Sequence, residues 1–356
     1  MVERILLALV LALPACKATK RTEGAPSASV SSSARAAKSA APPASVAKPP
    51  RPADAIAETG AGLVSLVGDA THVFWMSDGY RGAIKGILSL AKSGGEPTRL
   101  AGVHQAQGLW ATTGQLYFYD AGPELFALPK SGGRPKSILE NDALGPAAAE
   151  GDAFCYIGPP SAPGAGAKPS RAAPAGGPPR AKVLKSDERA LRCRKDGAEG
   201  EVEVGYATLY SSVILVSGDH VFWPLPLEGT IQAAPVVGGR GRSLLRDTRS
   251  ITAMAANKSS LFFVGTYKDD LGLFVVGKKG GTPRKLVALK ALTRQLAADD
   301  ENVYYAVKGS LWRVPLRKGE PTALFQDEPV MPAGLLVDDG SVYLADGFYL
   351  RRFRKP

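Results

Sequence analysis

The sequence predicts an all-β chain folded as a seven-bladed β-propeller with four strands in each blade. The main observation is a short aromatic, β-prone triplet that recurs seven times. The triplets occupy residues 73–75, 116–118, 153–155, 221–223, 261–263, 303–305 and 342–344. All spacings but one lie between 37 and 43 residues, and the exception is 68. A period near forty residues is typical of repeat architectures.

Each repeat has the pattern of four strands. A short apolar segment precedes the triplet, and a further apolar segment, a glycine-rich turn and a proline follow it, as in KSGGEP at residues 92–97 and KSGGRP at 130–135. The glycines allow the positive φ that tight hairpins need. Proline cannot donate to a sheet ladder, which suits the start of an outer strand. Four-stranded sheets repeated around an axis form a propeller; a β-solenoid is the alternative.

The two ends of the repeat region predict how the ring closes. The seventh repeat ends near residue 354, one strand short, while residues 53–59 are left over ahead of the first inner strand. We therefore expect residues 53–59 to supply the missing outer strand, because a closed ring removes an exposed sheet edge.

The first residues have the pattern of an export signal. Arg4 precedes an apolar run over residues 5–13, which at nine residues is too short to span a bilayer. The following LPAC at 13–16 resembles the lipobox of bacterial lipoproteins. The resemblance implies a signal peptide at 1–15, a lipid anchor on Cys16, and attachment to the cell envelope. Lys17 after the cysteine favours the outer membrane, facing the periplasm or the cell surface. An ordinary secretory signal with an incidental cysteine is the alternative.

The positive charge is concentrated in two segments. The net charge is +11, of which residues 17–52 carry +6 and residues 158–190 carry +4. Both segments are rich in Ala, Pro, Ser and Gly, a composition typical of disorder. We expect a lipid-anchored linker at 16–52 and a propeller at 53–356 with a disordered insert at 158–190. The propeller body is nearly neutral, which disfavours nucleic acid as a partner.

Two of the three cysteines flank the insert. Cys155 lies in the third triplet, and Cys193 lies in the strand expected beside it. Neighbouring antiparallel strands place Cβ atoms close enough for a disulfide, and an exported protein meets oxidising conditions. We predict a Cys155–Cys193 disulfide; two buried free thiols are the alternative.

The repeats, such as DENVYYAVKGSLWRVPLRKGEPTAL from Asp300, resemble YWTD-type propellers of low-density-lipoprotein receptors and their bacterial counterparts. The tetrads here are VFWM, VYYA or VYLA, and the aspartate that closes the motif is mostly missing. The resemblance implies ligand binding and scaffolding, and it implies no catalysis.

One face of the expected propeller carries the candidate binding residues. Connections between the second and third strands, and between blades, share that face and place mixed charge and tyrosine there. The candidates are Asp78, Tyr80, Arg81, His104, Arg246, Asp247, Arg249, Tyr267, Asp269, Asp270, Asp327 and Glu328. Residues that recur just before the triplets are predicted to form turns: His72, His220, Asp69, Asp219, Asp300 and Asp339.

The sequence contains no recognisable catalytic or metal-binding motif. Metal-ligand spacing, a phosphate loop and a nucleophile elbow are all missing, so no catalytic residue, metal or cofactor is predicted. We expect a monomeric, non-enzymatic envelope lipoprotein that binds a protein or glycan. The alternative is a secreted lyase or hydrolase that uses His104 beside a carboxylate as acid and base.

Overall fold

The computed structural model describes most of the unit Pro50–Pro356. The described residues are 52–59, 63–79, 84–120, 122, 124–139, 145–158, 188–198, 200–208, 210–317, 319–326 and 332–355. The predicted signal peptide, Cys16 and the linker lie outside them. So does the predicted insert, except for its two ends, which belong to strands. In the described part of the chain no helix is long and apolar enough to cross a membrane.

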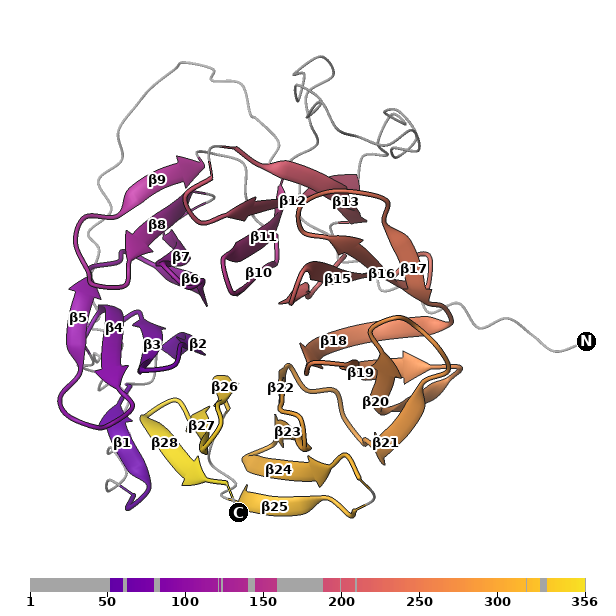
Figure 1. Cartoon of the computed structure of the whole chain (residues 1–356). Helices are drawn as coiled ribbons and strands as arrows, with labels where there is room; N and C mark the ends of the chain where they lie inside the picture. Colours follow the sequence, from indigo (N-terminus) through magenta and orange to yellow (C-terminus); the bar gives the residue numbers. More distant parts are fainter. Residues whose placement is uncertain are drawn as a thin grey trace, which may run out of the picture. The chain divides into compact units, whose positions relative to one another are not determined.

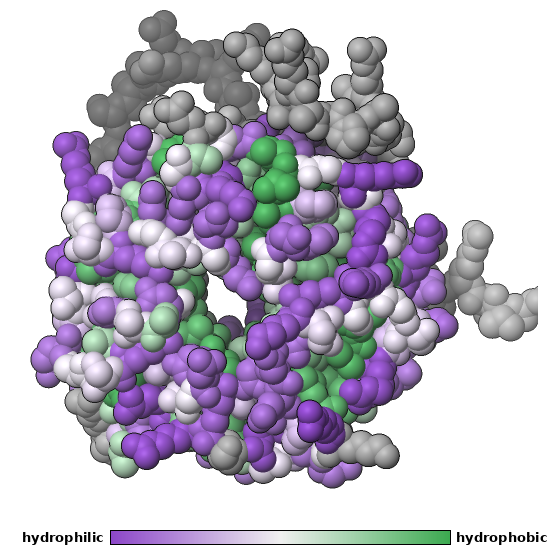
Figure 2. All heavy atoms as spheres, in the orientation of Figure 1, coloured by the Kyte–Doolittle hydropathy of each residue, from purple (hydrophilic) through white to green (hydrophobic). Residues whose placement is uncertain are grey.

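Seven four-stranded antiparallel sheets are arranged around a central axis, as predicted (Figure 1). In the same orientation, Figure 2 shows an opening at the centre of the ring. The inner strands of successive blades contact one another around this opening.

The first three blades follow one another along the chain. Blade 1 consists of β2 (Leu63–Gly68), β3 (His72–Ser77), β4 (Gly86–Ala91) and β5 (Thr98–Ala101). Blade 2 consists of β6 (Ala106–Ala111), β7 (Gln115–Asp120), β8 (Leu125–Pro129) and β9 (Lys136–Leu139). Blade 3 consists of β10 (Ala147–Glu150), β11 (Ala153–Gly158), β12 (Glu188–Lys195) and β13 (Val202–Thr208).

The remaining blades complete the ring. Blade 4 consists of β14 (Leu215–Ser217), β15 (His220–Leu225), β16 (Thr230–Pro235) and β17 (Arg242–Leu245). Blade 5 consists of β18 (Thr248–Ala256), β19 (Ser260–Tyr267), β20 (Asp270–Gly277) and β21 (Arg284–Ala288). Blade 6 consists of β22 (Gln295–Ala298), β23 (Asn302–Val307), β24 (Ser310–Pro315) and β25 (Thr322–Gln326). Blade 7 consists of β26 (Gly334–Val337), β27 (Ser341–Ala345), β28 (Tyr349–Arg354) and β1 (Ala55–Glu58).

The aromatic triplets form the second strand of each blade. In β3, for example, every residue from Val73 to Ser77 is buried. A neighbouring blade covers each face of such a strand, so it has a continuous apolar run instead of an alternating one. The hydrophobic core is therefore divided into clusters, most of them lying between adjacent blades.

Strand β1 closes the ring, which confirms the closure predicted from the sequence. It pairs with β28, with Ala55 opposite Arg351 and Glu58 opposite Tyr349. The buried Arg351 guanidinium lies between two carboxylates, Asp54 at 3.1 Å and the buried Asp346. It also lies 4.5 Å from the centre of the Phe325 ring in blade 6. One arginine thus joins the N-terminal strand, the last repeat and the preceding blade.

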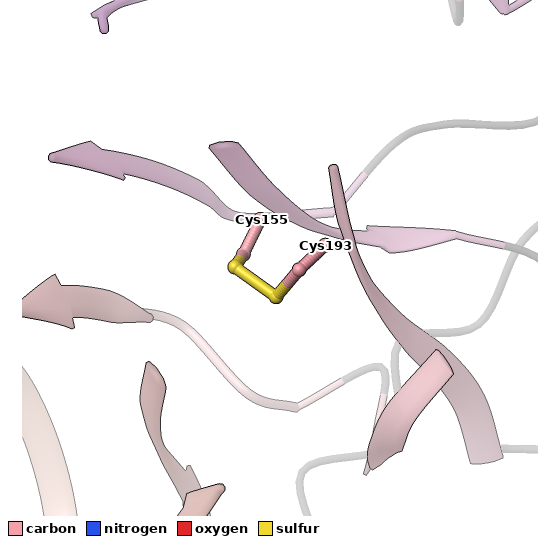
Figure 3. The surroundings of a disulfide bond; sticks show 2 residues. All are labelled: Cys155 and Cys193. Atoms are coloured by element: carbon pink, nitrogen blue, oxygen red, sulfur yellow. A yellow bond between two sulfur atoms is a disulfide. The ribbon is translucent and has the colours of Figure 1, made fainter. Parts of the chain in front are cut away.

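A disulfide joins β11 to β12, as predicted (Figure 3). Cys155 and Cys193 are direct partners in the antiparallel ladder, with Cα atoms 4.1 Å apart and both side chains buried. The two cysteines are 38 positions apart in the sequence. The bond joins the strand that precedes the predicted insert to the strand that follows it.

The propeller has two faces with different connections. The loop face carries the connections between second and third strands and those between blades; the turn face carries the other two turns of each blade. On the turn face a lysine ammonium repeatedly contacts an aspartate of the preceding blade. The pairs are Lys130 with Asp69 at 2.8 Å, Lys92 with Asp338 at 2.8 Å and Lys355 with Asp299 at 2.6 Å.

The same aspartates cap their own turns. Asp69 Oδ1 accepts the backbone N–H groups of Thr71 and His72, and Asp299 and Asp338 make equivalent bonds. The prediction was therefore right for Asp69 but wrong by one position in the paired aspartates. Asp300 and Asp339 are exposed, because the first aspartate of each pair is the one that faces the turn's amides.

Candidate binding site on the loop face of blade 5

The structure brings half of the predicted binding residues together in blade 5. Arg246 and Asp247 precede β18, Arg249 lies within it, and Tyr267, Asp269 and Asp270 surround the turn between β19 and β20. Asp78 follows β3 in blade 1, and His104 lies between blades 1 and 2, away from this group. Tyr80, Arg81, Asp327 and Glu328 lie outside the described residues.

Blade 5 is longer than its neighbours at the loop face. Its inner strand β18 has nine residues, whereas the other inner strands have three to six. The pairing of β18 with β19 is interrupted between Arg249 and Ala253, and Thr248 then pairs with Tyr267 beyond the interruption. Such bulges re-aim side chains and are frequent beside functional sites. The blade 5 hairpin therefore extends past the regular sheet.

The extension contains a concentration of unusual backbone conformations. Asp247, Ser250, Lys268 and Asp269 have φ values of 60°, 52°, 47° and 70°. Among the described residues other than glycine, only Lys308 also has a positive φ. Lys268 and Asp269 are the two central residues of the hairpin turn between the paired Tyr267 and Asp270, where a positive φ is required. Asp247 and Ser250 lie before and within the irregular part of β18, and there a positive φ costs free energy for a residue with a Cβ.

A small polar pocket lies at the same place. It has a volume of about 240 Å³, and its lining residues are Asp247, Arg249, Thr266, Lys268 and Asp269. Arg249 Nη1 lies 3.5 Å from Asp269 Oδ1, and the two side chains are 75% and 88% exposed. An ion pair this open contributes little to stability. Both charges are accessible to a polar ligand.

Exposed apolar side chains lie in the loop-face connections that lead into and through blade 4. Leu227 is 70% exposed and Tyr210 is 61% exposed. The Leu227 turn is tied to blade 5 because the Thr248 N–H donates to the Gly229 carbonyl at 2.9 Å. Neither residue was among the predicted binding residues, although both lie in loop-face connections where a large apolar group has no core to join.

A tyrosine and a carboxylate border the same area. The Tyr206 hydroxyl donates a hydrogen bond to Glu228 at 2.7 Å. Burial and this hydrogen bond raise the pKa of Tyr206 to about 12, so the hydroxyl stays protonated at neutral pH. We group these loop-face residues of blades 3 to 5 under the name blade 5 surface: Tyr206, Tyr210, Leu227, Glu228, Asp247, Arg249, Thr266, Lys268 and Asp269.

His104 has a defined carboxylate partner elsewhere on the loop face. Asp120, the last residue of β7, accepts the backbone N–H groups of His104 and Gln105, both at 2.7 Å. Its other oxygen lies 3.1 Å from His104 Nδ1. The imidazole is 90% exposed while Asp120 is only 10% exposed. Asp120 is thus the carboxylate beside His104 that the catalytic alternative requires, and it is the residue that closes a triplet strand.

The other two histidines have equivalent structural positions, as the repeat predicted. His72 and His220 each begin a second strand and stack on the phenylalanine two residues later, at 5.9 and 6.2 Å between ring centres. Across the part of the chain that the structure describes, no three or more His, Cys, Asp or Glu side chains are grouped to hold a metal ion.

Comparison with known proteins identifies the fold class alone. No protein-family model matches the chain, and no curated protein matches it in sequence. Among solved structures, virginiamycin B lyase from Staphylococcus aureus is similar over 82% of this chain and 94% of its own, with a TM-score of 0.54 and 13% identity. The computationally designed Ika8 protein (TM-score 0.53, 11% identity) covers 85% of this chain and 98% of its own.

A third similar structure, the AfRom2 CNH domain, has a TM-score of 0.53 and 11% identity over 84% of this chain and 97% of its own. At such identities the likeness shows the fold. The chain is a seven-bladed β-propeller protein, and its resemblance to YWTD repeats stays a prediction.

Proposed function

We propose that this chain is a cell-envelope lipoprotein whose propeller binds a protein or glycan partner through the blade 5 surface. The observation that carries the proposal is the coincidence of positive-φ turns, an open charged pocket and the exposed Leu227 of the adjoining blade 4 turn. Binding surfaces commonly combine aromatic or apolar anchors with a polar rim.

The composition of the pocket favours recognition over catalysis. It offers two cations, two carboxylates and one hydroxyl, and it contains no histidine or cysteine. These groups can hydrogen-bond to sugar hydroxyls or to a partner's charged loop. A volume of about 240 Å³ suits a single side chain or sugar ring, with the neighbouring apolar groups extending the contact.

The test measures how much of each envelope protein, and of each glycan on an array, is captured by the intact chain and by a pocket variant. We expect Arg249→Ala with Lys268→Ala to weaken capture of a specific partner about tenfold or more, the size typical of losing hot-spot contacts. Arg134→Ala with Lys136→Ala, two exposed cations on the turn face, is the matched control. Equal binding by the two variants would remove the blade 5 surface from the proposal.

The membrane attachment is a separate part of the proposal. It is supported by the apolar run at 5–13 and the LPAC sequence ending at Cys16. Two or more acyl chains hold a protein stably on a bilayer, whereas one does not. Mass spectrometry of the mature N-terminus should find a lipid-modified cysteine, and Cys16→Ser should release the chain from the membrane. An unmodified Cys16 would exclude the anchor.

His104 and Asp120 support a second candidate function, acid–base catalysis. Asp120 accepts hydrogen bonds from two backbone amides and contacts Nδ1 of the exposed imidazole, which leaves Nε2 as the proton acceptor. Virginiamycin B lyase shows that a similar fold can belong to a lyase. If envelope glycans or peptides are cleaved by this chain, His104→Gln should abolish the products and Asp120→Asn should reduce them. Cleavage unchanged in His104→Gln would exclude this pair.

A further inference from the structure

The turn face of blades 4, 5 and 6 carries a row of basic side chains. We call it the basic ridge: Arg240, Arg242, Lys278, Lys279, Arg284 and Arg317. They lie in or beside the connections from β16 to β17, from β20 to β21 and from β24 to β25 (Figure 1). Residues 236–245 and 277–288 contain no aspartate or glutamate. The nearly neutral propeller therefore has a local positive surface.

Hydrogen bonds hold the ridge together across blade boundaries. The Arg242 guanidinium donates to the carbonyl oxygens of Lys278 at 2.9 Å and Lys279 at 3.0 Å. Arg284 donates to the Leu316 carbonyl of blade 6 at 3.4 Å. These acceptors are neutral, so the bonds position the guanidinium groups without cancelling their charge.

Few carboxylates lie near the ridge. Asp219 is exposed beside it, where it is hydrogen-bonded to His220 and also lies in the field of Lys278. In blade 6, Glu320 and Glu301 are exposed, and the Glu301 carbonyl accepts the Leu316 N–H beside Arg317. Asp300, next to Glu301, is paired with Lys258. Blade 1 shows the contrast: its corresponding turn has Glu96, and its lysine, Lys92, is paired with Asp338. Blade 2 also has two exposed cations in this turn, Arg134 and Lys136, but the cations of blades 4 to 6 form a row joined across two blade boundaries.

The chain enters the propeller from this same face. Strand β1 begins at Ala55 and runs antiparallel to β28, which ends at the turn face. Just before β1, the Asp54 carbonyl accepts the N–H of Arg352, near the end of β28. Lys355, just past β28, bonds to Gly340 in a turn-face connection. Residue 52, where the described part of the propeller begins, therefore lies on the turn face, opposite the blade 5 surface.

We propose that the basic ridge rests on an anionic membrane surface and binds its phosphate headgroups. Basic residues near such a surface are attracted within about one Debye length. A row across three blades fits an extended surface better than a single small anion. Contact at the turn face directs the loop face away from the bilayer, where a partner can reach it. This orientation is independent of what the loop face binds.

The test uses the full chain carrying Cys16→Ser, so that no acyl chain contributes. Its sedimentation with phosphatidylcholine vesicles is compared with sedimentation with vesicles that also contain phosphatidylglycerol. The ridge variant is Arg240→Glu with Lys279→Glu, because both side chains are exposed and the hydrogen bonds that join the ridge are made by Arg242, Arg284 and the backbone. The matched control is Lys290→Glu with Arg294→Glu, two exposed cations on the loop face with the same total charge change. Thermal unfolding should show that both variants are folded.

We expect the ridge variant to bind anionic vesicles at least tenfold more weakly than the control, since each basic residue at such a surface contributes roughly fivefold. Binding should also weaken with salt and be negligible with neutral vesicles. Equal binding by ridge and control variants would overturn the proposal, because the basic residues at 17–52 would then account for the attraction. Binding to soluble polyphosphate but not to anionic vesicles would overturn it in favour of a soluble polyanion.

Discussion

Charged residues have different roles at the blade boundaries of the turn face and in the loop-face pocket of blade 5. On the turn face, Lys130 and Asp69 are mostly shielded and repeat a contact found again at two other blade boundaries. On the loop face, Arg249 and Asp269 form a loose, exposed pair on strained turns. The contrast teaches that charged residues at repeated positions join neighbouring blades. Charged residues at positions that do not recur between blades lie on the surface available for binding.

The first way to test this comparison is to open the ring at its buried arginine. Arg351→Leu should lower the free energy of unfolding by about 3–5 kcal/mol, because it leaves the buried Asp346 carboxylate without its partner. Urea denaturation measures the change. Arg354→Ala, an exposed neighbour in the same strand, should change stability by less than about 0.5 kcal/mol. Similar effects of the two substitutions would contradict the closing role of Arg351.

The second test removes the disulfide of blade 3. Cys155→Ala with Cys193→Ala should cost about 4 kcal/mol in the chain-entropy account of a 38-residue loop. Denaturation under oxidising conditions measures the loss. Because the bond lies away from blade 5, partner binding by the folded fraction should be unchanged. A loss of binding without a loss of stability would mean that the disulfide between β11 and β12 holds the loop face in its binding conformation.

The third test uses acid to weaken the turn-face contacts. Burial alone would raise the pKa of Asp69, but hydrogen bonds from Lys130 and two backbone amides outweigh it and hold the pKa well below the ordinary value. The pKa values of Asp299 and Asp338 are lowered in the same way, with lysine partners. A lowered folded-state pKa stabilises the protein above the unfolded-state pKa, near 4, and this contribution is lost as pH falls through the folded-state value.

Melting temperature should therefore fall as pH decreases below about 5, and the fall should be shallower in Asp69→Asn. The exposed Asp269→Asn on the loop face serves as the control and should keep the wild-type slope. Identical acid dependence in all three proteins would show that the Lys–Asp contacts contribute little to stability.

The smallest expected effect comes from relieving strain in blade 5. Asp269→Gly should leave stability unchanged or raise it by about 0.5–1 kcal/mol, because glycine adopts positive φ without the Cβ penalty. Binding to the loop-face partner should weaken, since a pocket carboxylate is lost. Calorimetry and a binding titration on the same samples separate the two effects. A marked loss of stability would mean that the turn is structural and would weaken the proposed binding role.

The sequence allowed the fold to be predicted because the relevant signals are local. The second strand is an uninterrupted apolar run in each repeat, and the turns require Gly and Pro at fixed offsets. The ring closure could also be predicted, since an orphan strand at one end matched a missing strand at the other. The Asp338 and Asp299 positions were misassigned by one residue, because only the turn geometry decides which of two adjacent aspartates faces the amides.

The binding surface was only partly predictable. Arg249 and Asp269 could be placed on the correct face from topology, but nothing in their local sequence indicated positive φ or a shared pocket. Leu227 and Tyr210 were missed because an isolated apolar residue in a connection has no pattern to reveal its exposure. Asp120 was missed because it lies sixteen residues from the histidine whose amide it binds.

By itself, then, the sequence determined the repeat, the number of blades, the closing strand and the cysteine pair, all of which depend on periodicity or adjacency along strands. Only the tertiary structure decided which lysines join which blades, why Arg351 is buried between two carboxylates, and where cations gather into a ridge. These features depend on contacts between residues tens to hundreds of positions apart, and such contacts exist only once the ring has closed.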